Sequence, residues 1–321
     1  MNFSGNSTRF GMKLEQAGAS GSVKGRTAVG LLRRLHSEKP LLPGTVVVES
    51  TSGNLGLALA GLLSTLGCTF ISVVDLKTPA QTRKSLRLLG AEVLVVEEDD
   101  GHGGYLLNRL SVVRRLCAEN PDYRWPNQYE NSAGPAIHRE TTGPEIVEQA
   151  GAALRAVYAP VSTGGTLAGV AGHLAEHRPD VDAVAVDLLG SIALGGTAGT
   201  RLLPGIGSSR PSVLLPPGSY HRSVLVDDVE SIAICRIVSD DLGLRLGSSS
   251  GCTLRALVAD LAAGRVSGLP VCLMADGGDK YGDTVYSDRW IADQGVGERL
   301  AAAVKGFRHE GLSFAWPEDR T

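Results

Sequence analysis

Three short segments, far apart in the chain, each combine glycine with small hydroxyl residues where an apolar run meets a helix-like stretch. They are residues 50–54, 162–166 and 247–251. Backbone N–H groups at the start of a helix have no partner within the helix, and glycine lets an anion approach them closely. One such loop is weak evidence for a site. Three in one chain indicate a site built around an anionic ligand.

The apolar pattern between these loops alternates between strands and helices. The predicted strands are 46–48, 70–74, 93–96, 156–161, 183–186 and 270–274, and the predicted helices are 28–35, 55–66, 80–89, 105–117, 167–176 and 252–263. Continuous apolar strands between amphipathic helices are typical of a parallel sheet covered on both faces. We therefore predict an α/β fold.

An irregular, proline-containing stretch separates a first β-α-β-α-β block, residues 44–117, from a second block that begins near Gly143. This division predicts two α/β lobes with a ligand-binding cleft between them. The stretch after Gly295 is polar, and we predict that it is ordered only in part.

Composition excludes several classes of partner. A net charge of −3 is too close to neutral to favour nucleic acid or an anionic membrane as a partner. Apolar runs fall short of the roughly 18 to 20 residues that span a bilayer, and no secretion signal is recognisable, so a cytoplasmic protein is expected. The five cysteines lack CxxC spacing and are expected to be free thiols. The histidines lack metal-ligand spacing, so no metal site is expected.

Lys24 lies among small residues just before the amphipathic run 28–35. The positive end of a helix dipole lowers the pKa of an amine, as a Schiff-base lysine requires. Taken alone, Lys24 would be interpreted as a solvated surface lysine. The three loops change that interpretation, because a lysine, a Gly/Thr phosphate cup and a serine near a second glycine turn are the parts that hold pyridoxal phosphate.

With these parts the chain resembles the fold-type II pyridoxal-phosphate enzymes, the cysteine synthase and cystathionine β-synthase family, over about residues 12–290. The resemblance implies a tryptophan synthase β-like fold of two three-layer lobes with mostly parallel sheets, and a homodimer. It also implies a larger cofactor-binding domain (1–39 and 132–305), a smaller mobile substrate-binding domain (40–131) and a tail (306–321).

The same resemblance assigns the site residues. Lys24, in the Ser-x-Lys motif, would form the imine with the cofactor and act as the catalytic base. Asn54 would contact the ring 3-hydroxyl, and Ser249 the pyridine nitrogen, where a neutral hydroxyl suits β-elimination and β-replacement. The phosphate cup would be Ser162, Thr163, Gly164, Gly165 and Thr166, and the substrate carboxylate would bind Thr51, Ser52 and Gly53. Gly18-Ala19 replaces the family's Asn-Pro, and Gly25 replaces a frequent Asp.

Further stretches resemble one branch, the N-(2-amino-2-carboxyethyl)-L-glutamate synthases. They are residues 49–56, 102–106, 127–129, 159–163, 203–210 and 285–288. This resemblance implies that O-phospho-L-serine and L-glutamate are joined through an α-aminoacrylate. The product is a precursor of 2,3-diaminopropionate, which is used in siderophores such as staphyloferrin B and in peptide antibiotics.

The remaining candidates leave alternatives open. Arg210, after a glycine-rich turn, is either a cation for the phosphate leaving group or a surface arginine. Gln128 is either a donor to the substrate carboxylate or a structural amide, and His102 and Tyr105 either contact ligand or form a helix start. The alternative functions are an O-phosphoserine or O-acetylserine sulfhydrylase and a non-catalytic, cofactor-binding regulator. A dinucleotide site is disfavoured, because no GxGxxG follows a strand.

Overall fold

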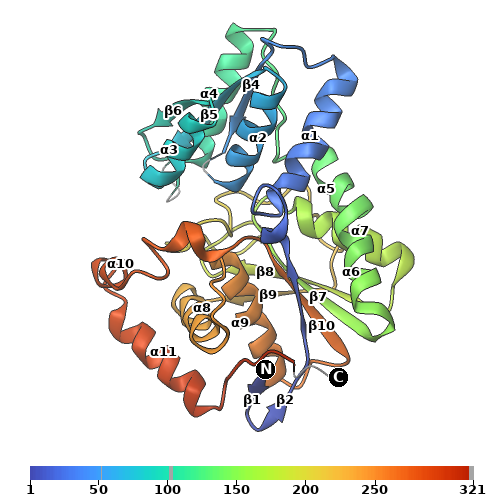
Figure 1. Cartoon of the computed structure of the whole chain (residues 1–321), viewed down its shortest axis with the longest axis vertical. Helices are drawn as coiled ribbons and strands as arrows, with labels where there is room; N and C mark the ends of the chain where they lie inside the picture. The colour runs from blue at the N-terminus through green and yellow to red at the C-terminus, as the bar shows by residue number, and fades with distance from the viewer. Residues whose placement is uncertain (52, 101–103, 318–321) are drawn as a thin grey trace.

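The computed structural model describes residues 1–51, 53–100 and 104–317. Within these residues the chain forms a larger lobe around a five-stranded sheet and a smaller lobe around a three-stranded sheet (Figure 1). All neighbouring strands of both sheets run parallel. The predicted α/β fold with mostly parallel sheets is confirmed.

The larger sheet has the order β3-β10-β7-β8-β9. Its strands are β3 (Gly11–Leu14), β10 (Leu269–Met274), β7 (Leu154–Pro160), β8 (Asp182–Leu188) and β9 (Arg222–Val226). Six consecutive residues of β8 are buried, as expected for a central strand covered on both faces. The sequence pattern did not predict β3 and β9, the two edge strands, because their burial is only partial.

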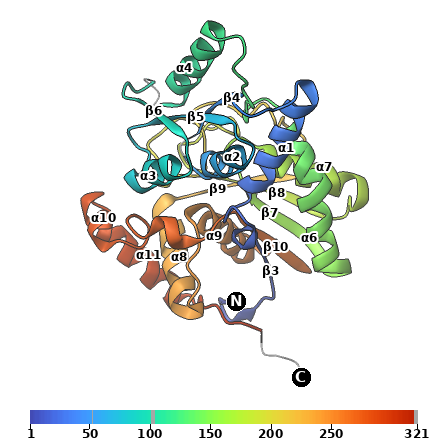
Figure 2. The same cartoon turned by 45° about the horizontal axis from the view of Figure 1, so that its top comes forward.

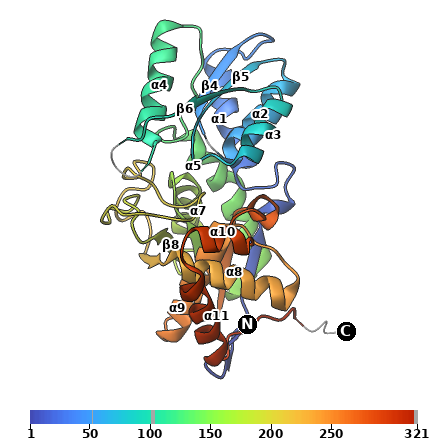
Figure 3. The ribbon, with the colours of Figure 1, turned by 90° about the vertical axis from the view of Figure 1, so that its left-hand side faces the viewer.

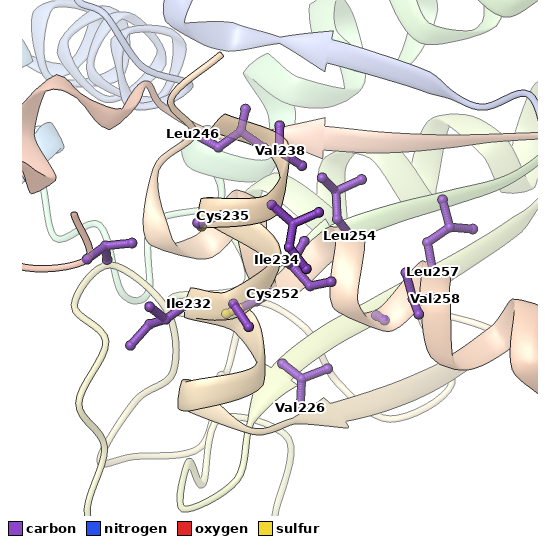
Figure 4. Close-up of a cluster of buried hydrophobic side chains, with 14 of the residues drawn as sticks. Val226, Ile232, Ile234, Cys235, Val238, Leu246, Cys252, Leu254, Leu257 and Val258 are labelled. Atoms are coloured by element: carbon purple, nitrogen blue, oxygen red, sulfur yellow. The ribbon is translucent and has the colours of Figure 1, made fainter. Parts of the chain in front are cut away.

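Helices cover both faces of this sheet (Figure 2). One face carries α6 (Gly143–Ala150) and α7 (Gly165–His177). The other carries α8 (Asp228–Leu242), α9 (Ser248–Ala262) and α11 (Gly297–His309). Figure 4 shows side chains of α8 and α9, among them Ile234, Leu254 and Leu257, packed together in the core on this face. The helix α9 begins four residues before the predicted helix 252–263. The hydroxyl-rich loop 247–251 therefore forms its first turn.

The smaller lobe is a three-layer unit. Its sheet has the order β4-β5-β6, with β4 (Val46–Ser50), β5 (Thr69–Asp75) and β6 (Glu92–Val96). The helices α2 (Asn54–Thr65) and α3 (Ala80–Leu88) lie on one face and α4 (Leu106–Glu119) on the other (Figure 3).

The helix α1 (Lys24–Glu38) joins the lobes. Its buried leucines, Leu31, Leu32 and Leu35, pack in the core of the smaller lobe, whereas Val23, just before it, packs in the core of the larger one. The short helix α5 (Ala133–Ile137) contacts both α1 and α7. A π-helical turn, η2 (His138–Thr142), then leads into α6. The start of α1 therefore lies between the lobes.

The remaining elements are short. They are β1 (Asn2–Phe3), β2 (Asn6–Ser7), η1 (Glu15–Ala17), η3 (Gly151–Ala153), η4 (Gly278–Tyr281) and α10 (Asp288–Asp293). One of them, η4, contributes Tyr281 to the cavity described below. Among the described residues, no helix is long and apolar enough to cross a membrane.

The prediction of partial order after Gly295 is wrong for residues 297–314. This stretch forms α11 and continues to Phe314. Leu300, Phe307, Leu312 and Phe314 are buried in the core shared with α8. Leu300 and Phe307 are seven residues apart and so lie on the same side of α11, which packs against α8, and Leu312 and Phe314 follow the end of the helix.

Candidate active site

A cavity lies between the lobes where the three glycine-containing loops meet. Its empty volume is about 500 Å³, part of it open to solvent. Its lining includes seven of the eight predicted cofactor residues, namely Lys24, Asn54, Ser162, Thr163, Gly164, Thr166 and Ser249. The eighth, Gly165, is the first residue of α7, directly beside this lining. Residues as far apart in sequence as Lys24 and Ser249 are thus brought to one place, at the ends of parallel strands.

Lys24 is the first residue of α1 and lines the cavity. The loop before it is tied to the end of β10, because the Val23 amide donates to the Ala275 carbonyl oxygen at 2.8 Å. Burial lowers the pKa of Lys24 to about 8, against an opposing effect of the Glu49 carboxylate. At pH 7 about a tenth of this amine is therefore uncharged, far more than for a lysine of ordinary pKa, and the uncharged form is the one that acts as a nucleophile or base.

Gly25, which departs from the family pattern, has a local steric reason. A Cβ atom at this position would lie 2.3 Å from Ser20 Oγ. That hydroxyl is held in place by a 2.9 Å hydrogen bond to the Ser22 carbonyl oxygen. The turn that presents Lys24 is therefore closed by a serine–glycine contact in this chain.

The loop 162–166 forms a cup of free backbone donors. Gly164 has a φ of +87°, and α7 begins at the next residue. Ser212 Oγ fixes the loop by donating to the Thr163 carbonyl oxygen at 2.7 Å. Among the hydrogen bonds of the described residues, none uses the backbone N–H of residues 163–166. These amides, at a helix N-terminus and beside a cavity, can bind an anion.

Ser249 lies in the first turn of α9 and lines the same cavity as the cup. Within the described part of the chain its hydroxyl has no hydrogen-bond partner, although the residue is 3 % exposed. A buried hydroxyl of this kind is available to a ligand atom. The turn before it requires glycine, since a Cβ atom at Gly247 would lie 1.7 Å from Asp276 Oδ1.

Asn54 is the first residue of α2, in the smaller lobe, and lines the cavity. Its Nδ2 donates to Asp276 Oδ2 at 2.7 Å, and its Oδ1 accepts a hydrogen bond from Lys280 Nζ. Asp276 also lines the cavity and is 1 % exposed. Burial raises the pKa of Asp276, although the hydrogen bonds from Asn54 and Tyr281 oppose the effect.

Comparison with known proteins identifies the family. The chain matches the model for the pyridoxal-phosphate dependent enzyme family over residues 3–277. It belongs to this family.

Solved structures of enzymes of this class are similar along nearly the whole chain. O-ureido-L-serine synthase is 26% identical, with 88% of this chain and 90% of that chain covered and a TM-score of 0.79. A hydrogen sulfide-producing enzyme from Fusobacterium nucleatum is 25% identical, with coverages of 86% and 94% and a TM-score of 0.79. The O-acetylserine dependent cystathionine beta-synthase from Helicobacter pylori is 29% identical, with coverages of 87% and 92% and a TM-score of 0.78. The protein is therefore a pyridoxal-phosphate dependent enzyme.

The residues at the cavity fit this cofactor. The free amides of 163–166 suit its phosphate, the lowered pKa of Lys24 suits imine formation, and the free hydroxyl of Ser249 suits the ring nitrogen. When bound, pyridoxal phosphate supplies an electron sink for negative charge at the α-carbon of an amino acid. These residue roles remain predictions, to be tested by substitution.

A buried histidine, which sequence reasoning missed, lies beneath the cup. His138 Nε2 is 2.9 Å from Thr27 Oγ1 and 3.3 Å from Thr166 Oγ1, and its Nδ1 is 2.8 Å from Thr142 Oγ1. Burial lowers the pKa of His138 to about 3, and the positive charges of Lys24 and Arg26 add to the effect. A neutral His138 therefore links α1 to the phosphate cup through two hydroxyl groups.

The predicted substrate-binding residues are more dispersed. Thr51 Oγ1 accepts the Gly56 amide at 2.9 Å and so caps α2, and Gly53 is the residue before that helix. Gln128 Nε2 donates to the Ser50 carbonyl oxygen at 3.0 Å, which holds the Thr51 loop from behind. Ser52, like His102, lies outside the described residues. None of the three described residues lines the cavity itself.

Glu49, which precedes this loop, is fully buried and was not singled out by sequence reasoning. Its carboxylate accepts hydrogen bonds from the Ser50 amide, the Trp125 indole and the Gln128 amide at 2.8, 3.1 and 3.0 Å. Burial raises the pKa of Glu49 to about 7 despite these donors. The carboxylate therefore shapes the loop and affects the charge of Lys24.

Arg210 lies apart from the cavity lining. Its Nη2 donates to Glu130 Oε1 at 3.0 Å, and its guanidinium group stacks 5.8 Å from the centre of the Tyr129 ring. Tyr105 directly precedes α4, with the Lys77 amine 5.8 Å from its ring centre. In the described part of the chain, no group of three or more His, Cys, Asp or Glu side chains could hold a metal ion.

Proposed function

We propose that this enzyme joins O-phospho-L-serine to L-glutamate, through the glutamate amine, to give N-(2-amino-2-carboxyethyl)-L-glutamate. The observation that carries the proposal is the cavity in which a lysine of lowered pKa faces a cup of free amides and an unpartnered serine hydroxyl. The choice of the two substrates rests on the branch resemblance of the sequence.

In this proposal each residue has one task. Lys24, once released by the incoming amino acid, removes its α-proton and later returns a proton to the same carbon. The loop of Thr51, Ser52 and Gly53 binds the substrate carboxylate, supported by Gln128 and Glu49. Arg210 receives the phosphate group as it leaves, which requires it to exchange its contact with Glu130 for the substrate.

We further propose that residues 40–131 move as a substrate-binding unit against the rest of the chain, and that the enzyme acts as a cytoplasmic homodimer. The movement is supported by the core of the smaller sheet, which is separate from that of the larger sheet. Because Leu31, Leu32 and Leu35 of α1 belong to the smaller core, α1 would move with this unit. The compartment is supported by the five free cysteines, four of which are buried.

A sulfhydrylase is the second candidate. The observation in its favour is the similarity to a structure described as an O-acetylserine dependent cystathionine beta-synthase and to one described as a hydrogen sulfide-producing enzyme. Such an enzyme would use a sulfur nucleophile in place of the amine of glutamate.

Product analysis separates these candidates. The holoenzyme is incubated with O-phospho-L-serine or O-acetyl-L-serine, each with L-glutamate or sulfide, and the products are identified by mass. We expect the glutamate adduct from O-phospho-L-serine as the main product and none from Lys24→Ala. Cysteine as the dominant product in the presence of both nucleophiles would overturn the proposal and favour the sulfhydrylase.

A further inference from the structure

We propose that Asp276 and Lys280 are positioning residues, which fix the side-chain amide of Asn54 so that one of its N–H bonds faces the cofactor. An asparagine amide has two N–H donors and one carbonyl acceptor. Asp276 Oδ2 takes one donor of Asn54 at 2.7 Å, and Lys280 Nζ donates to its Oδ1. The second N–H has no hydrogen-bond partner among the described residues and belongs to a residue that lines the cavity.

Both contacts specify the same orientation of the amide. An ammonium group can only donate hydrogen bonds, so Lys280 requires the carbonyl oxygen of Asn54 on its side. Asp276 Oδ2 also accepts the Tyr281 hydroxyl at 2.8 Å, so this oxygen acts as an acceptor and requires the N–H side. A flipped amide would face N–H against ammonium and oxygen against carboxylate, and both contacts would be repulsive.

The main chain of Asp276 ties this arrangement to the other cofactor segments. Residue 276 forms a β-bridge with Ser22, two residues before Lys24. Its carbonyl oxygen accepts the Gly247 amide at 3.1 Å, two residues before Ser249. One residue therefore sets the position of Asn54 relative to both Lys24 and Ser249.

The contacts also cross between the lobes. Asn54 begins α2 of the smaller lobe, whereas Asp276 and Lys280 follow β10 of the larger lobe. Approach of the lobes is therefore needed to orient the amide. The ligand group that suits the free N–H is an acceptor oxygen on the cofactor ring, and a flipped amide would present its own oxygen to it.

Cofactor titration of the protein freed of pyridoxal phosphate tests this inference without any substrate. We expect Lys280→Met and Asp276→Asn each to raise the Kd for pyridoxal phosphate about ten-fold, which corresponds to one charge-assisted hydrogen bond. The visible absorbance of the bound cofactor should change in both variants, because the charge of its ring oxygen is less well stabilised. Lys305→Met, an exposed lysine on α11, is the matched control and should leave both readouts unchanged.

A double-mutant cycle shows whether the two residues act through Asn54. In an Asn54→Ala background, Lys280→Met should weaken cofactor binding by less than two-fold. Because Lys280 is exposed, the Lys280→Met variant is expected to fold. It therefore still tests the inference if the Asp276→Asn variant fails to fold. Unchanged affinity and absorbance in Lys280→Met, or losses that add to that of Asn54→Ala, would overturn the inference. The outcome does not depend on which substrates the enzyme uses, so it can fail while the proposed function stands.

Discussion

Gly164 offers a direct test of the phosphate cup, because its replacement by alanine meets two separate obstacles. The backbone there has a φ of +87°, which costs an L-residue about 1–2 kcal/mol. The new Cβ atom would also lie 2.2 Å from Ser212 Oγ and 2.8 Å from Leu215 Cβ. Overpacking of this kind costs about 1–3 kcal/mol. We expect Gly164→Ala to destabilise the protein by about 2–5 kcal/mol.

Rotation of Ser212 cannot relieve the contact without a further loss. Its hydroxyl donates to the Thr163 carbonyl oxygen at 2.7 Å and so holds the cup in shape. Any shift of the loop also moves the free amides of 163–166. We therefore expect cofactor binding to weaken by at least ten-fold, beyond the effect on folding.

Denaturant unfolding of the cofactor-free protein and titration with pyridoxal phosphate measure the two effects. Gly61→Ala is the matched control, since Gly61 lies in the middle of α2 with nothing within 4 Å of the new Cβ atom. It should stabilise the protein by about 0.5–1 kcal/mol. Ser212→Ala introduced together with Gly164→Ala should recover part of the loss. A Gly164→Ala protein with native stability and native affinity for the cofactor would refute this account of the cup.

Three further predictions concern charge. Because burial lowers the pKa of Lys24 to about 8, the rate of cofactor incorporation into the cofactor-free protein should rise with a midpoint near pH 8; a midpoint above pH 10 would contradict this. The pKa of His138 is about 3 in the folded state and 6.5 in the unfolded state, so between pH 3 and pH 6.5 the unfolded state binds more protons. The free energy of unfolding should therefore fall by up to about 5 kcal/mol as the pH drops from 6.5 to 3. Denaturant unfolding across this range should show a smaller fall in His138→Gln, and an equal fall would refute the assignment. Arg210→Met should raise the KM for O-phospho-L-serine about ten-fold and that for O-acetyl-L-serine less than two-fold, and equal changes in steady-state assays would remove Arg210 from the phosphate-binding role.

Sequence reasoning identified seven of the fourteen residues that line the cavity, because each cofactor segment carries a local signal. The loops 162–166 and 247–251 show glycine and hydroxyl residues at a helix start, and the resemblance picked out Lys24 among the lysines. Seven of these predicted residues meet at one cavity in the structure. Local backbone requirements, such as the positive φ of Gly164, are therefore visible in the chain itself.

Asp276, Lys280 and His138 were missed for a different reason. Each acts through partners far away in sequence, such as Asn54 for Asp276 and Thr27 for His138. One signal was present for Asp276: it follows the buried strand β10, and the carboxyl ends of parallel strands meet at the same edge of a sheet. His138 offered no such signal, because it lies in a π-helical turn between two helices.

By itself, the amino-acid order determined the α/β class, the succession of buried strands and covering helices, and the loops able to hold a phosphate, because these depend on short-range periodicity and backbone freedom. The tertiary structure alone decided that α1 bridges the lobes, that the polar stretch after Gly295 packs as a helix, and that Asn54 is held between a carboxylate and an ammonium group. Those features depend on desolvation and hydrogen bonding between residues that only folding brings together.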